Sequence, residues 1–279
     1  MSNMLLELQN YFGLSFDRLD SFLQKPQCKP LGNPKTSQVY LIDDGYGKRY
    51  VLKISSSNSE SVRVQYEIST YAHGLTPKIL YFGIIGDRSV QIMEYVDGTK
   101  PNINDINIDE LIKTIYLLQI TIRDFHYDGT IEDKIRSFDN HLRAIASDAL
   151  AKVHRSKRQL VYYDLHRDNI LATSCGFKIV DLDGIIVSPD VFMPASLFTS
   201  FFMLQDPEAS LDDIRALISR WPEYLNERDV LNLMTIRAII GENFFRKKMG
   251  SGTASEEDLK LLELYSSLTQ KFDYLRRVV

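Results

Sequence analysis

The stretch LVYYDLHRDNIL, residues 160–171, decides the fold, and the segment FKIVD follows it at residues 177–181. Asp164 and Asn169 lie five positions apart in a polar turn between two short apolar runs, and Asp181 ends a third apolar run. Asp and Asn are common in turns for local reasons, so this pair alone would identify no site. The turn is flanked by apolar runs, and a third apolar run ends at Asp181. This arrangement indicates a functional loop between strands.

This order of side chains matches the chemistry of phosphoryl transfer. Such a centre uses an Asp to accept the proton of the attacking hydroxyl and an Asn five residues on to hold a metal. A further Asp beyond the next strand holds Mg²⁺ against the nucleotide phosphates. We therefore expect Asp164 to be the catalytic base, and Asn169 and Asp181 to be metal ligands.

The same segment resembles the aminoglycoside phosphotransferase and choline kinase superfamily, whose usual motif is H-G-D-L-H-x-x-N-[IV]-L followed by [IV]-D-[FWL]. Tyr162 replaces the leading His of the motif, and Tyr163 replaces its Gly. That His is a structural support in the family and not the base, so the chemistry is expected to survive its loss. Four positions match the motif: Asp164, His166, Asn169 and Asp181.

The resemblance implies an α+β, two-lobed protein-kinase-like fold. Residues 1–97 would form a nucleotide-binding lobe, an antiparallel sheet with one main helix and a short helical N-terminal extension. Residues 98–279 would form a larger, mostly helical lobe with the catalytic loop and the acceptor site. The implied cofactors are ATP or GTP, with Mg²⁺.

Composition is that of an ordinary globular protein. The 279 residues are 44% hydrophobic and 25% charged, enough for one two-lobed unit or two modest domains. A net charge of −4 argues against a nucleic-acid or anionic-membrane surface. No apolar run approaches the roughly 18 residues of a membrane span, and residues 1–24 contain no basic segment followed by an apolar core. Two cysteines, Cys28 and Cys175, fit a reduced cytoplasm, so we expect a cytoplasmic protein.

Period-two alternation in residues 38–42 and 49–54, around a turn at 43–47, predicts a β-hairpin. Residues 1–24 are expected to form one or two short helices. The loop at 32–37 has one glycine and is either a plain turn or a phosphate-covering loop. In the second case its backbone N–H groups and the hydroxyl of Ser37 would meet the phosphates.

Lys53 ends a strand pattern and resembles the phosphate-pairing lysine of the superfamily. In residues 60–72, Val64, Ile68 and Tyr71 trace one helical face. Glu67 projects on the same side, so it is expected to reach inward and orient Lys53. A solvated charge at a strand end is the alternative for this lysine.

Residues 76–83 and 89–98 predict two further strands, the second running into a linker. The resemblance implies that the backbone of Glu94 and Val96 binds adenine and that Met93 lines the pocket. His166 is expected near the acceptor hydroxyl or the phosphates. Asp183 would join a metal, meet a cationic substrate, or cap a turn.

Helical spacing dominates the rest of the chain. Amphipathic helices are expected at 111–125, 138–145 and 261–275, and buried ones at 191–204 and 230–245. Ser210 and Ser255 begin capping-box patterns. Eight acidic residues fall in the part of the chain expected to form the acceptor side: Asp183, Asp190, Glu208, Asp212, Asp213, Glu223, Glu227 and Glu242. If they cluster, they would attract a polycationic acceptor such as an aminoglycoside, although solvated helix faces give the same pattern.

The function expected from these patterns is transfer of the γ-phosphate of ATP to a hydroxyl of a small molecule. The acceptor would be an antibiotic, an amino alcohol or a sugar. If it is an antibiotic, the protein would be a resistance factor. A non-catalytic nucleotide-binding pseudokinase is one alternative, prompted by Tyr162 and Tyr163. An effector-type kinase acting on a protein is another. Against the latter, the segment at 184–192 is too short for a regulated loop, and no A-P-E sequence follows it.

Overall fold

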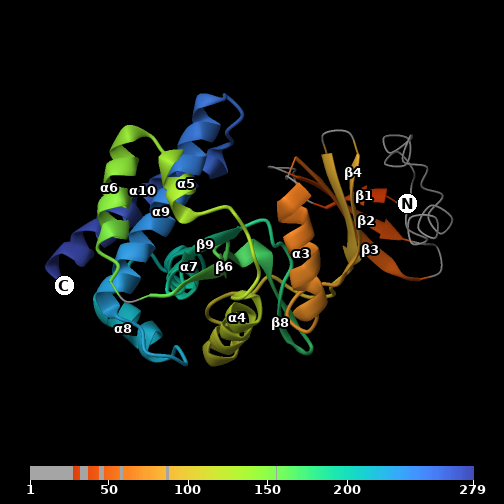
Figure 1. Ribbon diagram of the computed structural model, residues 1–279, viewed down its shortest axis with the longest axis horizontal. Helices are drawn as coiled ribbons and strands as arrows, with labels where there is room; N and C mark the ends of the chain where they lie inside the picture. Colours follow the sequence, from red (N-terminus) through yellow and green to blue (C-terminus); the bar gives the residue numbers. More distant parts are fainter. Residues whose placement is uncertain (1–27, 32–36, 44–46, 57–58, 86–87, 155) are drawn as a thin grey trace. The chain divides into compact units, whose positions relative to one another are not determined.

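The structure is a computed structural model that describes residues 28–31, 37–43, 47–56, 59–85, 88–154 and 156–279. The chain folds as two compact units, Met1–Asp97 and Gly98–Val279, and each is described here by itself (Figure 1). The expected helices at 1–24, and the loop before Ser37, lie outside the described residues.

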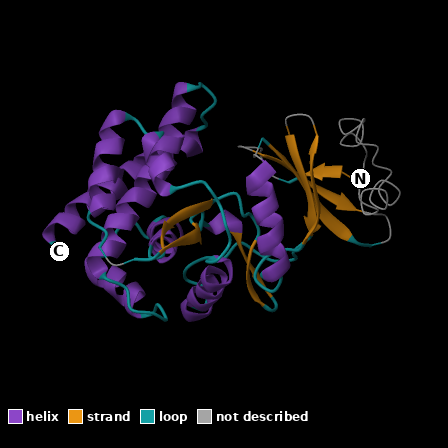
Figure 2. Ribbon diagram, in the orientation of Figure 1, coloured by secondary structure: helices purple, strands orange, loops and turns teal. Residues whose placement is uncertain are grey.

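The first unit is built on a five-stranded antiparallel sheet (Figure 2). The predicted hairpin is confirmed: β2 pairs with β3 along its whole length, with Val39 opposite Lys53. On its other side β3 pairs with β5, with Lys53 opposite Gln91. The strands, in spatial order, are β1 (Cys28–Pro30), β2 (Ser37–Asp43), β3 (Arg49–Ser55), β5 (Arg88–Glu94) and β4 (Ile79–Ile85).

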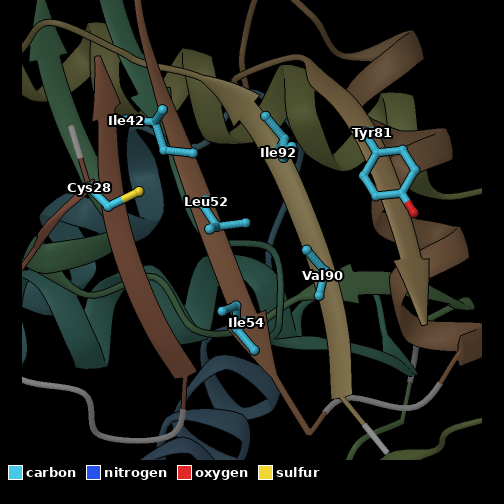
Figure 3. Packing of buried hydrophobic residues seen from close by; sticks show 7 residues of the cluster. All are labelled: Cys28, Ile42, Leu52, Ile54, Tyr81, Val90 and Ile92. Carbon is cyan, nitrogen blue, oxygen red and sulfur yellow. The ribbon is translucent and has the colours of Figure 1, made fainter. Parts of the chain in front are cut away.

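Alternation along the strands separates two faces of this sheet. One face carries an apolar cluster, shown in Figure 3, whose members are Cys28, Ile42, Leu52, Ile54, Tyr81, Val90 and Ile92. The intervening residues of β3 and β5 are polar and nevertheless buried: Lys53, Ser55, Ser89 and Gln91. Helix α3 (Ser59–Tyr71) packs on this polar face, because Nε2 of Gln91 donates to Oε1 of Gln65 at 2.9 Å.

The buried face of α3 differs from the sequence prediction. Val64 and Ile68 are buried as expected, but Tyr71 is 70% exposed. Three polar residues fill the middle of the buried face: Ser61, Gln65 and Ser69. Because only apolar residues were counted, the predicted face was rotated by roughly a quarter of a turn.

The second unit contains two small antiparallel ladders and most of the helices. Strand β6 (Arg158–Tyr162) pairs with β9 (Ile185–Pro189), and β7 (Ile170–Thr173) pairs with β8 (Gly176–Ile179). The 3₁₀ turn η2 (Arg167–Asn169) precedes β7. The helices are α4 (Ile108–Ile122), α5 (Ile131–Arg136), α6 (Asn140–Ala151), α7 (Phe192–Leu197), the π-helical turn η3 (Phe198–Met203), α8 (Leu211–Ser219), α9 (Glu227–Gly250) and α10 (Glu256–Val278).

Hydrophobic periodicity explains these helices. Leu111, Ile115, Leu118 and Ile122 are fully buried, which confirms the amphipathic pattern of α4. All residues from Phe192 to Met203 are buried, as predicted for this apolar run. Helix α9 is buried from Asp229 to Asn243, which confirms the second buried helix.

Both predicted capping boxes are present, Ser210 with Asp213 at α8 and Ser255 with Asp258 at α10. A third, Thr130 with Asp133, fixes the start of α5. Within the described ranges, no helix is both long enough and apolar enough to cross a membrane.

Candidate active site

Two backbone contacts bring the polar segments of the second unit together. Strand β6 ends at Tyr162, and the N–H of Tyr163 donates to the carbonyl of Gly184 at 2.8 Å. On the other ladder, the N–H of Val180 donates to the carbonyl of Asn169 at 2.9 Å. The loop after β6, which carries Asp164 and Asn169, is thus tied to the segment after β8 that carries Asp181.

Gly184 allows the close approach of these segments. A Cβ at this position would lie 2.5 Å from the Cβ of Asp164 and 3.0 Å from its backbone nitrogen. The opposing atoms belong to the backbone and the first carbon of a side chain, which cannot swing away. The requirement is visible in the sequence as Asp181-Leu182-Asp183-Gly184, but spacing alone did not identify this glycine.

The carboxylate of Asp164 is held from both sides. Nη2 of Arg237, on α9, donates to Oδ1 at 3.0 Å, and Nδ2 of Asn169 donates to Oδ2 at 3.3 Å. Nε2 of His166 lies 3.5 Å from the same Oδ2. Arg237 is 3% exposed, whereas the Asp164 side chain keeps 35% of its surface exposed. The carboxylate is therefore oriented by the protein and still accessible to a ligand.

Charge fixes the protonation state of Asp164. Burial by itself would raise the pKa of this carboxyl, but the hydrogen bond and charge of His166, with Arg237 and Lys134, outweigh burial and hold the pKa well below its usual value. Asp164 is consequently an anion near neutral pH and only a weak base. Such a carboxylate is better suited to orienting a hydroxyl than to removing its proton early.

The amide of Asn169 has a defined orientation. Its Nδ2 donates to Oη of Tyr162 at 3.1 Å and to the carbonyl of Asp164 at 3.0 Å. Tyr162 in turn donates its hydroxyl to that carbonyl at 3.0 Å. Since the amide nitrogen is engaged inside the loop, Oδ1 is the atom of Asn169 left to bind a cation.

Tyr162 thus supports the loop at the position where the superfamily motif has His. It is fully buried, and burial, followed by the nearby Asp164 and Asp181, raises its pKa well above that of an ordinary tyrosine. The phenol stays protonated and keeps donating to the loop. The replacement of His by Tyr preserves a hydrogen-bonding support.

Asp181 and Asp183 form a local turn, with the N–H of Asp183 donating to Oδ1 of Asp181 at 2.9 Å. In the part of the chain that the structure describes, no group of three or more acidic, His or Cys side chains could hold a metal. Mg²⁺ requires no such cage, because it binds one or two protein oxygens plus phosphate oxygens and water. The carboxamide oxygen of Asn169 and the carboxylate of Asp181 are a donor set of that kind.

His166 is part of the loop structure. Its Nδ1 accepts from the N–H of Asp168 at 3.2 Å, and its Nε2 faces Asp164. Asp168 pairs with Lys100 at 2.5 Å. The arrangement makes His166 a positioning partner of Asp164.

Two cations that sequence reasoning missed accompany Asp164. Nε of Arg237 donates to the carbonyl of Tyr163 at 2.9 Å, and its guanidinium lies 5.9 Å from the Tyr163 ring. Nζ of Lys134, on α5, lies 5.9 Å from the same ring. A lone arginine within the apolar run of α9 was the available signal, since arginine is rarely buried without a partner.

In the first unit, Lys53 is 4% exposed, on a face of the sheet that also carries the buried amide of Gln91 and the hydroxyls of Ser55 and Ser89. Gln91, opposite it on β5, donates to Gln65, and Nε2 of Gln65 donates to Oγ of Ser61 at 3.1 Å. The strand-end alternative of a solvated lysine is therefore wrong. Glu67 forms an ion pair with Arg63 one turn earlier on α3.

The remaining predicted nucleotide-binding residues lie at the ends of strands β2 and β5 or in the linker after β5. Ser37 is the first residue of β2 and pairs with Ser55. Met93 is 7% exposed, and Val96 is half-buried in the linker after β5. The N–H of Glu94 donates to the carbonyl of Lys78 at 3.0 Å, and Oε2 of Glu94 accepts from the N–H of Lys78 at 3.2 Å.

Most of the eight carboxylates expected to attract a cation have local partners on separate elements. Asp212 and Glu227 pair with Arg215, and Glu242 pairs with Arg246. Asp213 caps α8 through Ser210, Glu223 accepts from the hydroxyl of Tyr116, and Asp190 accepts from the N–H of Val191. Attraction of a polycationic acceptor by these residues stays a prediction.

No protein-family model and no curated protein matches the chain. Solved structures do. Amicoumacin kinase hAmiN, in complex with AMP-PNP, Ca²⁺ and Ami, is 15% identical with a TM-score of 0.72, covering 95% of this chain and 96% of that one. Choline kinase LicA from Streptococcus pneumoniae is 15% identical with a TM-score of 0.67, covering 96% and 100%. Aminoglycoside phosphotransferase APH(4)-Ia is 14% identical with a TM-score of 0.64, covering 98% and 99%. The chain has the fold that these proteins share.

Proposed function

We propose that this protein is a kinase that transfers the γ-phosphate of ATP, in the presence of Mg²⁺, to a hydroxyl of a small molecule. The observation that carries the proposal is the accessible Asp164 carboxylate, held by buried Arg237 and by Asn169, in a fold shared with small-molecule kinases. A purely structural aspartate at the end of a strand has no need of this support.

Asp164 would accept a hydrogen bond from the acceptor hydroxyl and direct its oxygen lone pair toward the γ-phosphorus. The new bond forms between that oxygen and phosphorus, the bond to the β-phosphate oxygen breaks, and ADP leaves. The hydroxyl proton passes to Asp164 late and then to solvent, since the low pKa of Asp164 makes early removal unfavourable. Catalysis of this kind relies on positioning and on charge stabilisation, because a loose transition state needs little covalent chemistry from the protein.

Asn169 and Asp181 are the residues that would hold Mg²⁺, which neutralises phosphate charge when bound. Lys53 would contact the phosphates, with Ser37 near them, and the backbone of Glu94 and Val96 would bind adenine beside Met93. Glu67, which forms an ion pair with Arg63, would orient Lys53.

The acceptor is proposed to be a small molecule because the segment between Asp181 and α7 is short and is tied into the β6–β9 ladder. The neighbours act on, or are crystallised with, amicoumacin, choline and hygromycin B. We propose no single acceptor among antibiotics, amino alcohols and sugars on this basis. A protein acceptor and a catalytically inactive module are the outcomes that the test must distinguish.

The test measures ADP formation with ATP or GTP and Mg²⁺ across hydroxyl-bearing candidates, after thermal-shift selection of those that stabilise the fold. Asp164→Asn is the control: it is nearly isosteric, and general-base contributions predict a fall in kcat of roughly 10²-fold or more. Nucleotide affinity and melting temperature should change little. Turnover of Asp164→Asn near the wild-type rate would refute the assignment.

A further inference from the structure

Helix α5 holds one lysine in a fixed position beside the candidate site. The capping box of Thr130 and Asp133 fixes the start of the helix, and Ile131 and Ile135 are buried beneath it. The preceding turn is bound to β9, because the N–H of Val187 donates to the carbonyl of Gly129 at 2.8 Å. Lys134, on the same short helix, is half-buried and therefore has a restricted range of positions.

Lys134 differs from several lysines of this unit. Lys100, Lys152, Lys248 and Lys260 each form an ion pair with a carboxylate. Among the described residues, the ammonium of Lys134 has no ion-pair or hydrogen-bond partner, and it lies 5.9 Å from the centroid of the Tyr163 ring. A partly desolvated ammonium without a partner is costly, and an oxyanion from a ligand would relieve that cost.

The charges around Asp164 indicate which ligand fits. Arg237 is already satisfied by the carboxylate of Asp164 and the carbonyl of Tyr163. Lys134 adds a second cation next to this carboxylate, and of the two cations its ammonium is the one without a hydrogen-bond partner among the described residues. Burial, followed by the charge of Arg237, lowers the pKa of Lys134, while Asp164 opposes the shift. An ammonium on the acceptor would be repelled here, and an anionic oxygen would be attracted.

We propose that Lys134 binds an anionic oxygen group, a carboxylate or phosphate, that the acceptor carries next to the hydroxyl presented to Asp164. The identity of this hydroxyl as the reacting group rests on the proposed kinase function; the binding of the anion does not. The acceptor class is accordingly a hydroxy acid or phosphorylated polyol. Choline and aminoglycosides, which are cations, belong to the opposite class.

The first experiment compares four matched probes: glycerol, glycerate, glycerol 3-phosphate and the cationic 2-amino-1,3-propanediol. Each is added to the full chain with Mg²⁺ and AMP-PNP, and trace acetylation of lysines is quantified by peptide mass spectrometry. We expect glycerate or glycerol 3-phosphate to protect Lys134 at about tenfold lower concentration than the neutral and cationic probes. Lys260, paired with Glu256 and 73% exposed, is the internal control and should not be protected. Equal protection by all four probes, best protection by the cation, or none by either anion would overturn the proposal.

The second experiment compares Lys134→Met, Lys134→Arg and the control Lys260→Met by direct titration of the more protective anion. Met retains most of the aliphatic packing of lysine and removes only the charge. We expect the dissociation constant to rise about tenfold or more in Lys134→Met, to recover largely in Lys134→Arg, and to stay unchanged in Lys260→Met. AMP-PNP affinity should be the same in all variants.

These titrations need no turnover, so they separate the two proposals. Anion binding that requires Lys134 in a protein without phosphotransferase activity would support this inference and refute the kinase function. Phosphotransferase activity combined with anion affinity that ignores Lys134→Met would leave the kinase function standing. That second result would show that Lys134 acts only on Asp164, and it would overturn the inference.

Discussion

The key charged residue of each unit has a different kind of neighbour. In the first, Lys53 is buried on the face of the sheet that carries an amide layer, in which Gln91, opposite Lys53, donates to Gln65 on α3. In the second, the carboxylate of Asp164 forms an ion pair with the buried guanidinium of Arg237. Hydrogen-bonded amides constrain position without adding charge, whereas charged partners constrain position and also lower the pKa of a carboxyl.

This contrast is tested most directly by removing one charged group from each unit. Asp181→Ala should abolish the Mg²⁺-dependent part of nucleotide binding, because it removes the carboxylate oxygen that Mg²⁺ requires. Lys53→Ala should weaken ATP binding about tenfold or more with and without metal, as expected for a lost charge-assisted contact. Calorimetric titrations of ATP with Mg²⁺ and with EDTA distinguish the two. Unchanged titrations in both variants would move the nucleotide site elsewhere.

Replacing the charged support of Asp164 should have the next largest effect. Arg237→Met is expected to lower the free energy of unfolding by about 1–2 kcal/mol, the lower part of the range for charged hydrogen bonds, since the Asp164 side chain is one-third exposed. It should also reduce kcat, because Asp164 loses its orientation. Urea denaturation and steady-state kinetics are the measurements.

The matched control is Arg215→Met on α8, which breaks exposed pairs with Asp212 and Glu227. Exposed pairs contribute little, so this variant should stay within about 0.5 kcal/mol of wild type with unchanged kcat. Equal losses in the two arginine variants would contradict a special role for Arg237.

The amide layer of Gln65 and Gln91 makes a non-additive prediction. Gln65→Leu or Gln91→Leu alone strands a buried amide and should cost roughly 1–3 kcal/mol, whereas the double variant should cost less than the sum. The KM for ATP should rise in each single variant if the layer positions Lys53. A double-mutant cycle with additive losses would show that the two amides do not act together.

Sequence patterns predicted the strands, helices and caps of both units better than the side-chain contacts between distant segments. The β2–β3 hairpin, the buried helices and the capping boxes at Ser210 and Ser255 depend on local periodicity, so they could be predicted from the chain itself. Arg237 could not, because it reaches Asp164 across 73 positions. The face of α3 was misplaced for a related reason: buried Gln65 is polar, and its partner Gln91 lies on another element.

The candidate site shows the same difference between residues that local spacing predicts and residues that it does not. Motif spacing predicted Asp164, Asn169 and Asp181, and backbone hydrogen bonds bring their segments together. Whether these residues and the nucleotide-binding set perform the assigned roles stays a prediction. The side chains that surround Asp164, chiefly Lys134 and Arg237, come from separate helices and follow no motif.

The smallest expected effect is in the pH dependence. The pKa of Asp164 is depressed, so its carboxylate contributes stability above the unfolded-state value of about 3.9, and this contribution is lost as pH falls through the lower folded value. Asp164 should therefore impose no acid limb on kcat/KM between about pH 5 and 8. A limb in that range that moves in Arg237→Met would show that the pKa of Asp164 is not depressed.

The close contact of Gly184 with Asp164 also has a consequence for how this sequence can vary. Every other amino acid has a Cβ, so each missense change at position 184 places an atom against the chain that carries the carboxylate. Even the small residues Ala, Ser and Val would place this atom too close to Asp164. In a library of all single substitutions selected for function, position 184 should therefore tolerate none of the other amino acids.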